Sequence, residues 1–153
     1  MRAVVQRVTA SNVKVDGELK GEIGLGYNVL LGVMNGDTKA EAELLAAKIS
    51  NLRVFEDESG KMNLDIHAVD GEILAISQFT LCADIHKGNR PSFIPSAPPE
   101  EANMLYEYFC ECLLNNGVKK VEKGVFGADM KVEIHNDGPV TIIMDTDIWS
   151  KKK

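Results

Sequence analysis

The fold is decided by residues 72–81, which read Glu72-Ile73-Leu74-Ala75-Ile76-Ser77-Gln78-Phe79-Thr80-Leu81. An Asp-Gly turn at residues 70–71 precedes this stretch. Its first half is too uniformly apolar for a strand with one face in water. We therefore expect residues 72–81 to form a strand through the centre of a sheet. Its second half changes character, because hydrogen-bonding side chains follow at Ser77, Gln78 and Thr80.

Further strands are indicated on both sides of this segment. The first fifteen residues alternate between apolar and polar side chains and end in Asp16-Gly17, a strong hairpin signal. Residues 27–33 form an apolar run that is typical of a strand buried on both faces. A short strand is expected around residues 52–55. Alternation returns at residues 130–134 and 140–144, with a turn between them.

Two segments in the middle of the chain have helical periodicity. Thr38 and Glu41 form a capping box ahead of a helix at residues 39–51. Pro99 suits the first turn of a second helix, which should end near Asn115 ahead of Gly117. The order of elements predicts an α/β fold, namely a mixed, partly barrel-like β-sheet of about seven to eight strands with two main helices packed on one side.

Length and composition restrict the class of protein. With 153 residues, 44% of them hydrophobic, we expect a single domain over residues 1–150 and a basic tail at residues 151–153. The chain has no long apolar run, and its start reads as a strand, which predicts a cytoplasmic protein without a membrane partner. Cys82, Cys110 and Cys112 contain no CxxC pair and supply neither a disulfide framework nor a zinc site. We expect no metal and no cofactor.

A net charge of −6 means that any nucleic acid must be bound by local basic patches. The candidate patches are Lys87 with Arg90, the group Lys119, Lys120 and Lys123, and the tail at residues 151–153. Taken alone, each patch is more typical of a solvated surface than of a binding site.

Two segments break local rules in the way that functional sites do. One is Ser77-Gln78-Phe79-Thr80, and the other is the turn at residues 136–141, whose Gly-Pro bond is able to adopt the cis form. Composition alone favours an ordinary strand end for the first segment and an ordinary β-turn for the second. A Ser-His-Asp triad lacks its nucleophile elbow, and the three histidines lack metal-ligand spacing. Cys82 is either a thiol nucleophile or a small core residue.

Taken together, the segments at residues 77–81 and 136–141 resemble the paired signature of the D-aminoacyl-tRNA deacylase family. The resemblance extends to residues 1–8, 87–93 and 124–130, and so covers essentially the whole chain. It implies a hydrolase that cleaves the ester bond of D-aminoacyl-tRNA and rejects L-aminoacyl-tRNA, which is a proofreading activity. Glycyl-tRNA is an expected second substrate, because glycine has no side chain. The resemblance also implies a homodimer with its active site at the subunit interface.

The resemblance assigns the catalytic segment to Ser77, Gln78, Phe79 and Thr80. The ester passes through a tetrahedral oxyanion, which the backbone N–H groups of Phe79 and Thr80 are placed to stabilise. The attack that forms this oxyanion comes from water, with help from the ribose 2′-hydroxyl. A covalent mechanism through the Thr80 hydroxyl is the alternative, although residues 77–81 contain no base to activate it.

By the same resemblance, Gly138 and Pro139 reach in from the partner subunit and exclude the L substituent through a cis peptide, a steric form of selection. Arg7 is expected to hydrogen-bond this turn, the alternative being an exposed strand residue.

The tRNA itself is expected to contact two further groups of residues. Lys87 and Arg90 are candidates for its acceptor-stem phosphates. Phe126 and Met130 are candidates for an apolar face against the adenine, although core packing is commoner for such residues. Two rival readings remain, a small hydrolase that depends on Cys82 and a non-enzymatic dimeric binding module.

Overall fold

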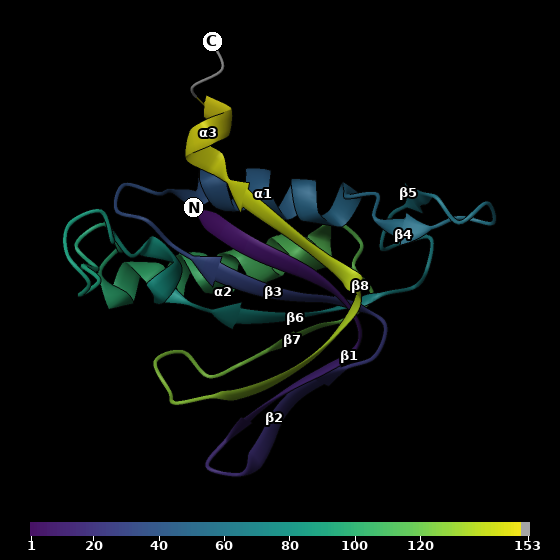
Figure 1. The fold of residues 1–153 in the computed structure, drawn as a ribbon, viewed down its shortest axis with the longest axis horizontal. Coiled ribbons are helices and arrows are strands. Elements are labelled where there is room, and N and C mark those ends of the chain that lie inside the picture. Colours follow the sequence, from purple (N-terminus) through teal and green to yellow (C-terminus); the bar gives the residue numbers. More distant parts are fainter. Residues whose placement is uncertain (151–153) are drawn as a thin grey trace.

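The computed structural model describes residues 1–150, in which strands dominate both ends of the chain and the two long helices lie in the middle (Figure 1). The elements in chain order are β1 (Arg2–Val15), β2 (Glu18–Ile23), β3 (Gly26–Gly32), α1 (Lys39–Asn51), β4 (Phe55–Glu56), β5 (Met62–Leu64), β6 (Glu72–Ser77), the 3-10 helix η1 (Phe79–Cys82), α2 (Pro99–Asn115), β7 (Val121–Lys123), β8 (Lys131–Asp145) and α3 (Thr146–Ser150). The expected basic tail at residues 151–153 lies outside the described residues.

The main sheet is built around the long strand β1. The first half of β1 pairs with β3 and its second half with β2, while β8 pairs along nearly its whole length, all antiparallel. Beyond β3 the order continues with β6 and β7, both parallel to their neighbours. The predicted central position of residues 72–77 is confirmed, because β6 has a strand on each side.

The sheet curls until its two ends meet. The Lys120 ammonium group, beside β7, donates a hydrogen bond to the Glu22 carbonyl of β2, 3.0 Å away. A Cβ atom placed on Gly21 of β2 would lie only 3.0 Å from the Lys123 carbonyl oxygen of β7. The predicted mixed, partly barrel-like sheet is therefore confirmed. Six of the eight strands found in residues 1–150 form it, and β4 and β5 form a separate two-stranded sheet.

Two apolar cores lie on opposite faces of this sheet. Ile73 and Ala75 face a large core that includes α1 and α2, whereas Leu74 and Ile76 face a smaller cluster inside the curl. The uniformly apolar sequence of β6 follows from this burial on both faces.

Both predicted helices are confirmed, and both pack on the same side of the sheet (Figure 1). α1 begins after Thr38, whose hydroxyl accepts a hydrogen bond from the Ala40 N–H at 3.2 Å. The Glu41 carboxylate in turn accepts one from the Thr38 N–H at 2.6 Å. The short helix α3 was not predicted. None of the helices in residues 1–150 is both long and apolar enough to cross a membrane.

Two predicted strands have different bounds in the structure. The strand expected at residues 72–81 ends at Ser77, and the chain then turns into η1. The last ladder bond is donated by the Gln78 N–H to the Leu31 carbonyl, and β3 itself ends one residue later at Gly32. The strand expected around residues 52–55 begins only at Phe55 and pairs with β5 across a polar turn.

The segment at residues 136–139 is not a turn between two strands, as the sequence had suggested, but a bulge within the single strand β8. Asn136 lies opposite Val8 and Thr141 lies opposite Gln6, so residues 137–140 together oppose only Arg7. The strand resumes after the bulge because β1 is continuous there and pairs with β8 on both sides of it.

Candidate functional site

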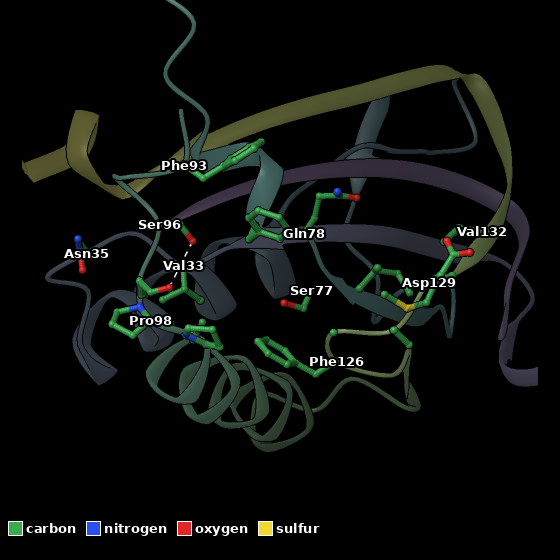
Figure 2. A pocket seen from close by; sticks show the side chains of 18 residues that line it. Val33, Asn35, Ser77, Gln78, Phe93, Ser96, Pro98, Phe126, Asp129 and Val132 are labelled. Carbon is green, nitrogen blue, oxygen red and sulfur yellow. Dashed lines mark hydrogen bonds between the residues drawn. The ribbon is translucent and has the colours of Figure 1, made fainter. Parts of the chain in front are cut away.

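A cavity of about 720 Å³ opens where β6 ends. Its walls come from the end of β6, the loop after β3, the loop that leads into α2, and the loop before β8 (Figure 2). A cavity of this size is typical of a site for a small molecule or for the end of a larger one. Polar residues are few, so the walls are mainly apolar.

The structure brings five of the predicted site residues to this cavity, namely Ser77, Gln78, Phe79, Phe126 and Met130. The Ser77 side chain points into the cavity with Phe126 close by (Figure 2). At the rim, the Phe79 ring is 54% exposed and packs edge-on against the Phe93 ring, with centroids 5.0 Å apart. Aromatic faces therefore line the entrance as well as the interior.

Thr80 lies beside the cavity without lining it. Its hydroxyl oxygen accepts a hydrogen bond from the Gln78 side-chain amide at 2.5 Å. The first bond of the η1 turn is donated by the Leu81 N–H to the Gln78 carbonyl. The N–H groups of Phe79 and Thr80 precede it and have no hydrogen-bond partner within residues 1–150. Two adjacent backbone donors are thus left free at the end of β6.

Several cavity residues were not singled out from the sequence, among them Asn35, Phe93, Ser96 and Asp129. Phe93 and Ser96 belong to the proline-rich loop between η1 and α2, whose length is the one signal for them. Asp129 has the only carboxylate among the cavity residues of the described chain. It is 90% exposed and forms a salt bridge with Lys131 at 3.3 Å, which places it at the mouth.

The bulge in β8 is exposed at Gly138 and Pro139, and neither residue lines the cavity of its own chain. The peptide between them is cis. Arg7 lies beneath, only 5% exposed, and is therefore not the exposed strand residue of the alternative reading. Its guanidinium donates to the Asp137 carbonyl at 3.1 Å and to the Val54 carbonyl at 2.7 Å. Arg7 thus joins the bulge to the segment ahead of β4.

Lys87 and Arg90 are both exposed in the loop that also supplies Phe93 and Ser96. Neither side chain forms a salt bridge in the part of the chain that the structure describes, and neither lines the cavity. Both cations remain available on the surface near one wall of the site.

Cys82 is fully buried, and its thiol donates to the Val33 carbonyl at 3.4 Å. Burial raises the pKa of this thiol, which disfavours the thiolate that a nucleophile requires. Cys82 is therefore a core residue. Within residues 1–150, no three His, Cys, Asp or Glu side chains are grouped closely enough to hold a metal ion.

Comparison with known proteins assigns the chain to a family. Residues 4–145 match the family model described as D-Tyr-tRNA(Tyr) deacylase. The chain belongs to the D-aminoacyl-tRNA deacylase family. A D-aminoacyl-tRNA deacylase of Clostridium botulinum (strain Eklund 17B / Type B) is 56% identical, with 95% of this chain and 97% of the relative covered. One from Thermosipho melanesiensis is 53% identical over the same shares.

Two solved structures share the fold of this chain. A protein named c-Myc DNA Unwinding Element Binding Protein superposes with a TM-score of 0.90 at 48% identity, covering 95% of this chain and 98% of that one. A probable eukaryotic D-amino acid tRNA deacylase has a TM-score of 0.81 at 16% identity, covering 94% and 97%. The second likeness concerns the fold alone.

Proposed function

We propose that this chain hydrolyses the ester bond of D-aminoacyl-tRNA in the cytoplasm, releasing the D-amino acid and the tRNA. Membership of the deacylase family supports the proposal. The observation that carries it is the pair of unpartnered N–H groups on Phe79 and Thr80, placed beside the apolar cavity at the end of β6. Such a pair suits the oxyanion of an ester under attack by water.

The mechanism relies on backbone groups. The ester carbonyl lies against the Phe79 and Thr80 N–H groups, which stabilise the negative charge that develops on its oxygen. The Thr80 hydroxyl is held by the Gln78 amide and has no adjacent base, so we assign it a structural role. Water attacks the carbonyl carbon with help from the ribose 2′-hydroxyl, and the ribose oxygen leaves with the proton.

A homodimer completes the site in this proposal. The sheet face opposite the helices carries an apolar strip made of Val4, Leu30 and the 79% exposed Ile143. η1 packs on the same face, because a Cβ atom on Gly32 would meet Leu81 at 2.9 Å. Burying this strip against a second copy covers exposed apolar surface. It also brings the partner's β8 bulge towards the cavity.

Selection between D and L substrates is assigned to Gly138 and Pro139 of the partner. Their exposed backbone needs no pocket for a particular side chain, so many D-amino acids are accepted while an L substituent meets the bulge. Glycyl-tRNA, whose amino acid has no side chain, is a second substrate. Phe126 and Met130 are proposed to face the terminal adenine, and Lys87 and Arg90 to contact phosphates of the acceptor stem.

The function is tested by incubating the protein with D-tyrosyl-tRNA and L-tyrosyl-tRNA, with and without a thiol-blocking reagent. We expect release of D-tyrosine that survives thiol blocking, and little release of L-tyrosine. Loss of activity on blocking would favour a mechanism through a cysteine. No release from either substrate would favour a binding module without enzymatic activity.

A second measurement separates the backbone mechanism from a covalent one. Thr80→Ala removes the hydroxyl but keeps the backbone N–H, so single-turnover hydrolysis of D-tyrosyl-tRNA should fall by roughly tenfold at most. A loss of several orders of magnitude would identify Thr80 as a nucleophile and contradict the backbone mechanism.

A further inference from the structure

The β8 bulge exposes two of its four residues to solvent. Residues 137–140 stand opposite Arg7 alone, and both Gly138 and Pro139 are exposed. A segment of this kind keeps a defined shape only if its neighbours hold it, because an unpaired loop otherwise gains conformational entropy. Arg7 holds it from below through the Asp137 carbonyl.

A second restraint comes from Asn136, the residue just before the bulge. Its side-chain oxygen accepts a hydrogen bond from the Val140 N–H at 3.0 Å, and its amide nitrogen donates to the Thr141 hydroxyl at 3.0 Å. Both partners lie on the far side of Gly138 and Pro139. One side chain therefore closes the base of the bulge by a local bond between side chain and backbone.

We infer that Asn136, together with Thr141, is a positioning residue for selection between D and L substrates. It touches no substrate, and it fixes where Gly138 and Pro139 present their backbone to the partner's cavity. The inference rests on the proposed role of those two residues. Gln6 of β1 also donates to the Thr141 hydroxyl, at 3.4 Å, so the closure is tied to the neighbouring strand.

The amide of Asn136 supplies the acceptor and the donor that this closure requires. Without the side chain, the N–H of the largely buried Val140 loses its partner, and only Arg7 restrains the bulge. Aspartate keeps the acceptor for Val140 and can accept from the Thr141 hydroxyl. Alanine keeps neither bond. An effect seen with alanine but not with aspartate is therefore due to loss of these hydrogen bonds and not simply to the replacement of asparagine.

The test measures kcat/KM for D-tyrosyl-tRNA, L-tyrosyl-tRNA and glycyl-tRNA in Asn136→Ala, Asn136→Asp and Thr141→Val. We call the kcat/KM for D-tyrosyl-tRNA divided by that for L-tyrosyl-tRNA the D-to-L ratio. We expect Asn136→Ala to lower this ratio by roughly tenfold or more, mainly through faster hydrolysis of L-tyrosyl-tRNA. Hydrolysis of glycyl-tRNA should change by less than about threefold, since glycine has no side chain to be selected. Thr141→Val should lower the ratio less, and Asn136→Asp should restore most of it.

Ser11→Ala is the matched control. Its hydroxyl donates to the Glu133 carbonyl at 2.7 Å between the same two strands, away from the bulge. This variant should lose stability without a change in the D-to-L ratio. A uniform fall for all three substrates in Asn136→Ala would mean a general structural role and would overturn the inference. If Asn136→Ala does not fold, an unchanged ratio in Thr141→Val overturns it instead.

Gly138→Ala distinguishes failure of this inference from failure of the proposed function. Gly138 has a φ of +130°, and an added Cβ atom would lie 2.8 Å from a Val140 methyl carbon and 3.1 Å from the Arg7 guanidinium. This variant displaces the bulge itself. A ratio that falls in Gly138→Ala but not in Asn136→Ala refutes the positioning role alone. A ratio unchanged in both refutes the proposed role of the bulge as well.

Discussion

The start of helix α1 and the bulge of β8 are closed in the same way. At the helix, the Thr38 hydroxyl accepts from the Ala40 N–H. At the bulge, the Asn136 side chain accepts from the Val140 N–H. In each case a short polar side chain satisfies a backbone donor that the regular element leaves free. Local hydrogen bonding therefore does not tell the two regions apart.

They differ in what the closed segment does with its surface. α1 buries Ala42, Leu45, Ala46 and Ile49 against the sheet. The bulge leaves Gly138 and Pro139 in solvent, and only Val140 of its four residues is buried in the core. Capping therefore contributes mainly to stability where the capped segment covers a core, and mainly to the position of the exposed backbone where the segment stays in solvent. Changes in the two regions should accordingly alter different measurements.

The largest effect is expected from Leu45→Ala in α1. Leu45 is fully buried, and truncation of a buried leucine leaves a cavity that costs about 2–5 kcal/mol of unfolding free energy. Urea denaturation measures this loss. The D-to-L ratio of the folded protein should stay at the wild-type value, because the hydrogen bonds that hold the bulge come from Arg7 and Asn136 and not from α1. A changed ratio would show that α1 contributes to substrate selection as well as to stability.

Arg7→Ala should lower both the unfolding free energy and the D-to-L ratio, since Arg7 lies between the core and the bulge. Two carbonyls, those of Val54 and Asp137, lose a charged donor, and we expect a loss of about 2–3 kcal/mol in unfolding free energy. The D-to-L ratio should fall as well. Arg7→Lys keeps the charge but lacks the planar fork, so it should restore little. An unchanged ratio would show that the bulge needs no support from below.

A smaller effect is expected from Thr38→Ala. Loss of an N-cap side chain costs about 1 kcal/mol, which urea denaturation should resolve, with no change in the D-to-L ratio. Ser59→Ala in the exposed turn between β4 and β5 is a control, expected to change stability by less than about 0.5 kcal/mol. An effect of Thr38→Ala on the D-to-L ratio would mean that the cap of α1, like the closure of the bulge, contributes to substrate selection.

The same contrast explains which elements the sequence predicted. Both ends of α1 and α2 were found correctly because capping and periodicity are local signals. The end of β6 was misplaced because it depends on where its partner β3 stops. The bulge was taken for a turn because its register depends on β1, more than a hundred residues away. Long-range pairing is absent from any local pattern.

The residues of the candidate site also differ in whether a local sequence pattern marks them. Ser77, Gln78 and Phe79 stood out because polar groups follow an apolar strand, and the structure places them at the cavity. Asp129 gave no signal, and Ser96 had only the length of its loop, because folding alone returns these loops to β6. Arg7 was left open between two readings. Its burial follows from the face that it shares with Ala3 and Val5, which looks towards the helices.

The smallest expected effect concerns pH and the helix cap. The hydrogen bond from the Thr38 hydroxyl is the main cause that lowers the pKa of Glu41 below its ordinary value of 4.5. A carboxyl whose pKa is lowered by folding stabilises the protein above its unfolded pKa and ceases to do so as pH falls through its folded pKa.

The stability difference between wild type and Glu41→Gln should therefore be constant from about pH 6 to 8 and shrink below about pH 4. Urea denaturation in the plateau between about pH 6 and 8 and again below about pH 4 measures this stability difference. The exposure of Glu41 keeps the difference small. A difference that grows on acidification would reverse the sign of the argument. The closure of the bulge uses an amide and a hydroxyl, neither of which titrates in this range. The change in D-to-L ratio caused by Asn136→Ala should accordingly be the same at pH 6 and pH 8. The cap of α1 and the closure of the bulge, although similar in geometry, therefore differ in their dependence on pH.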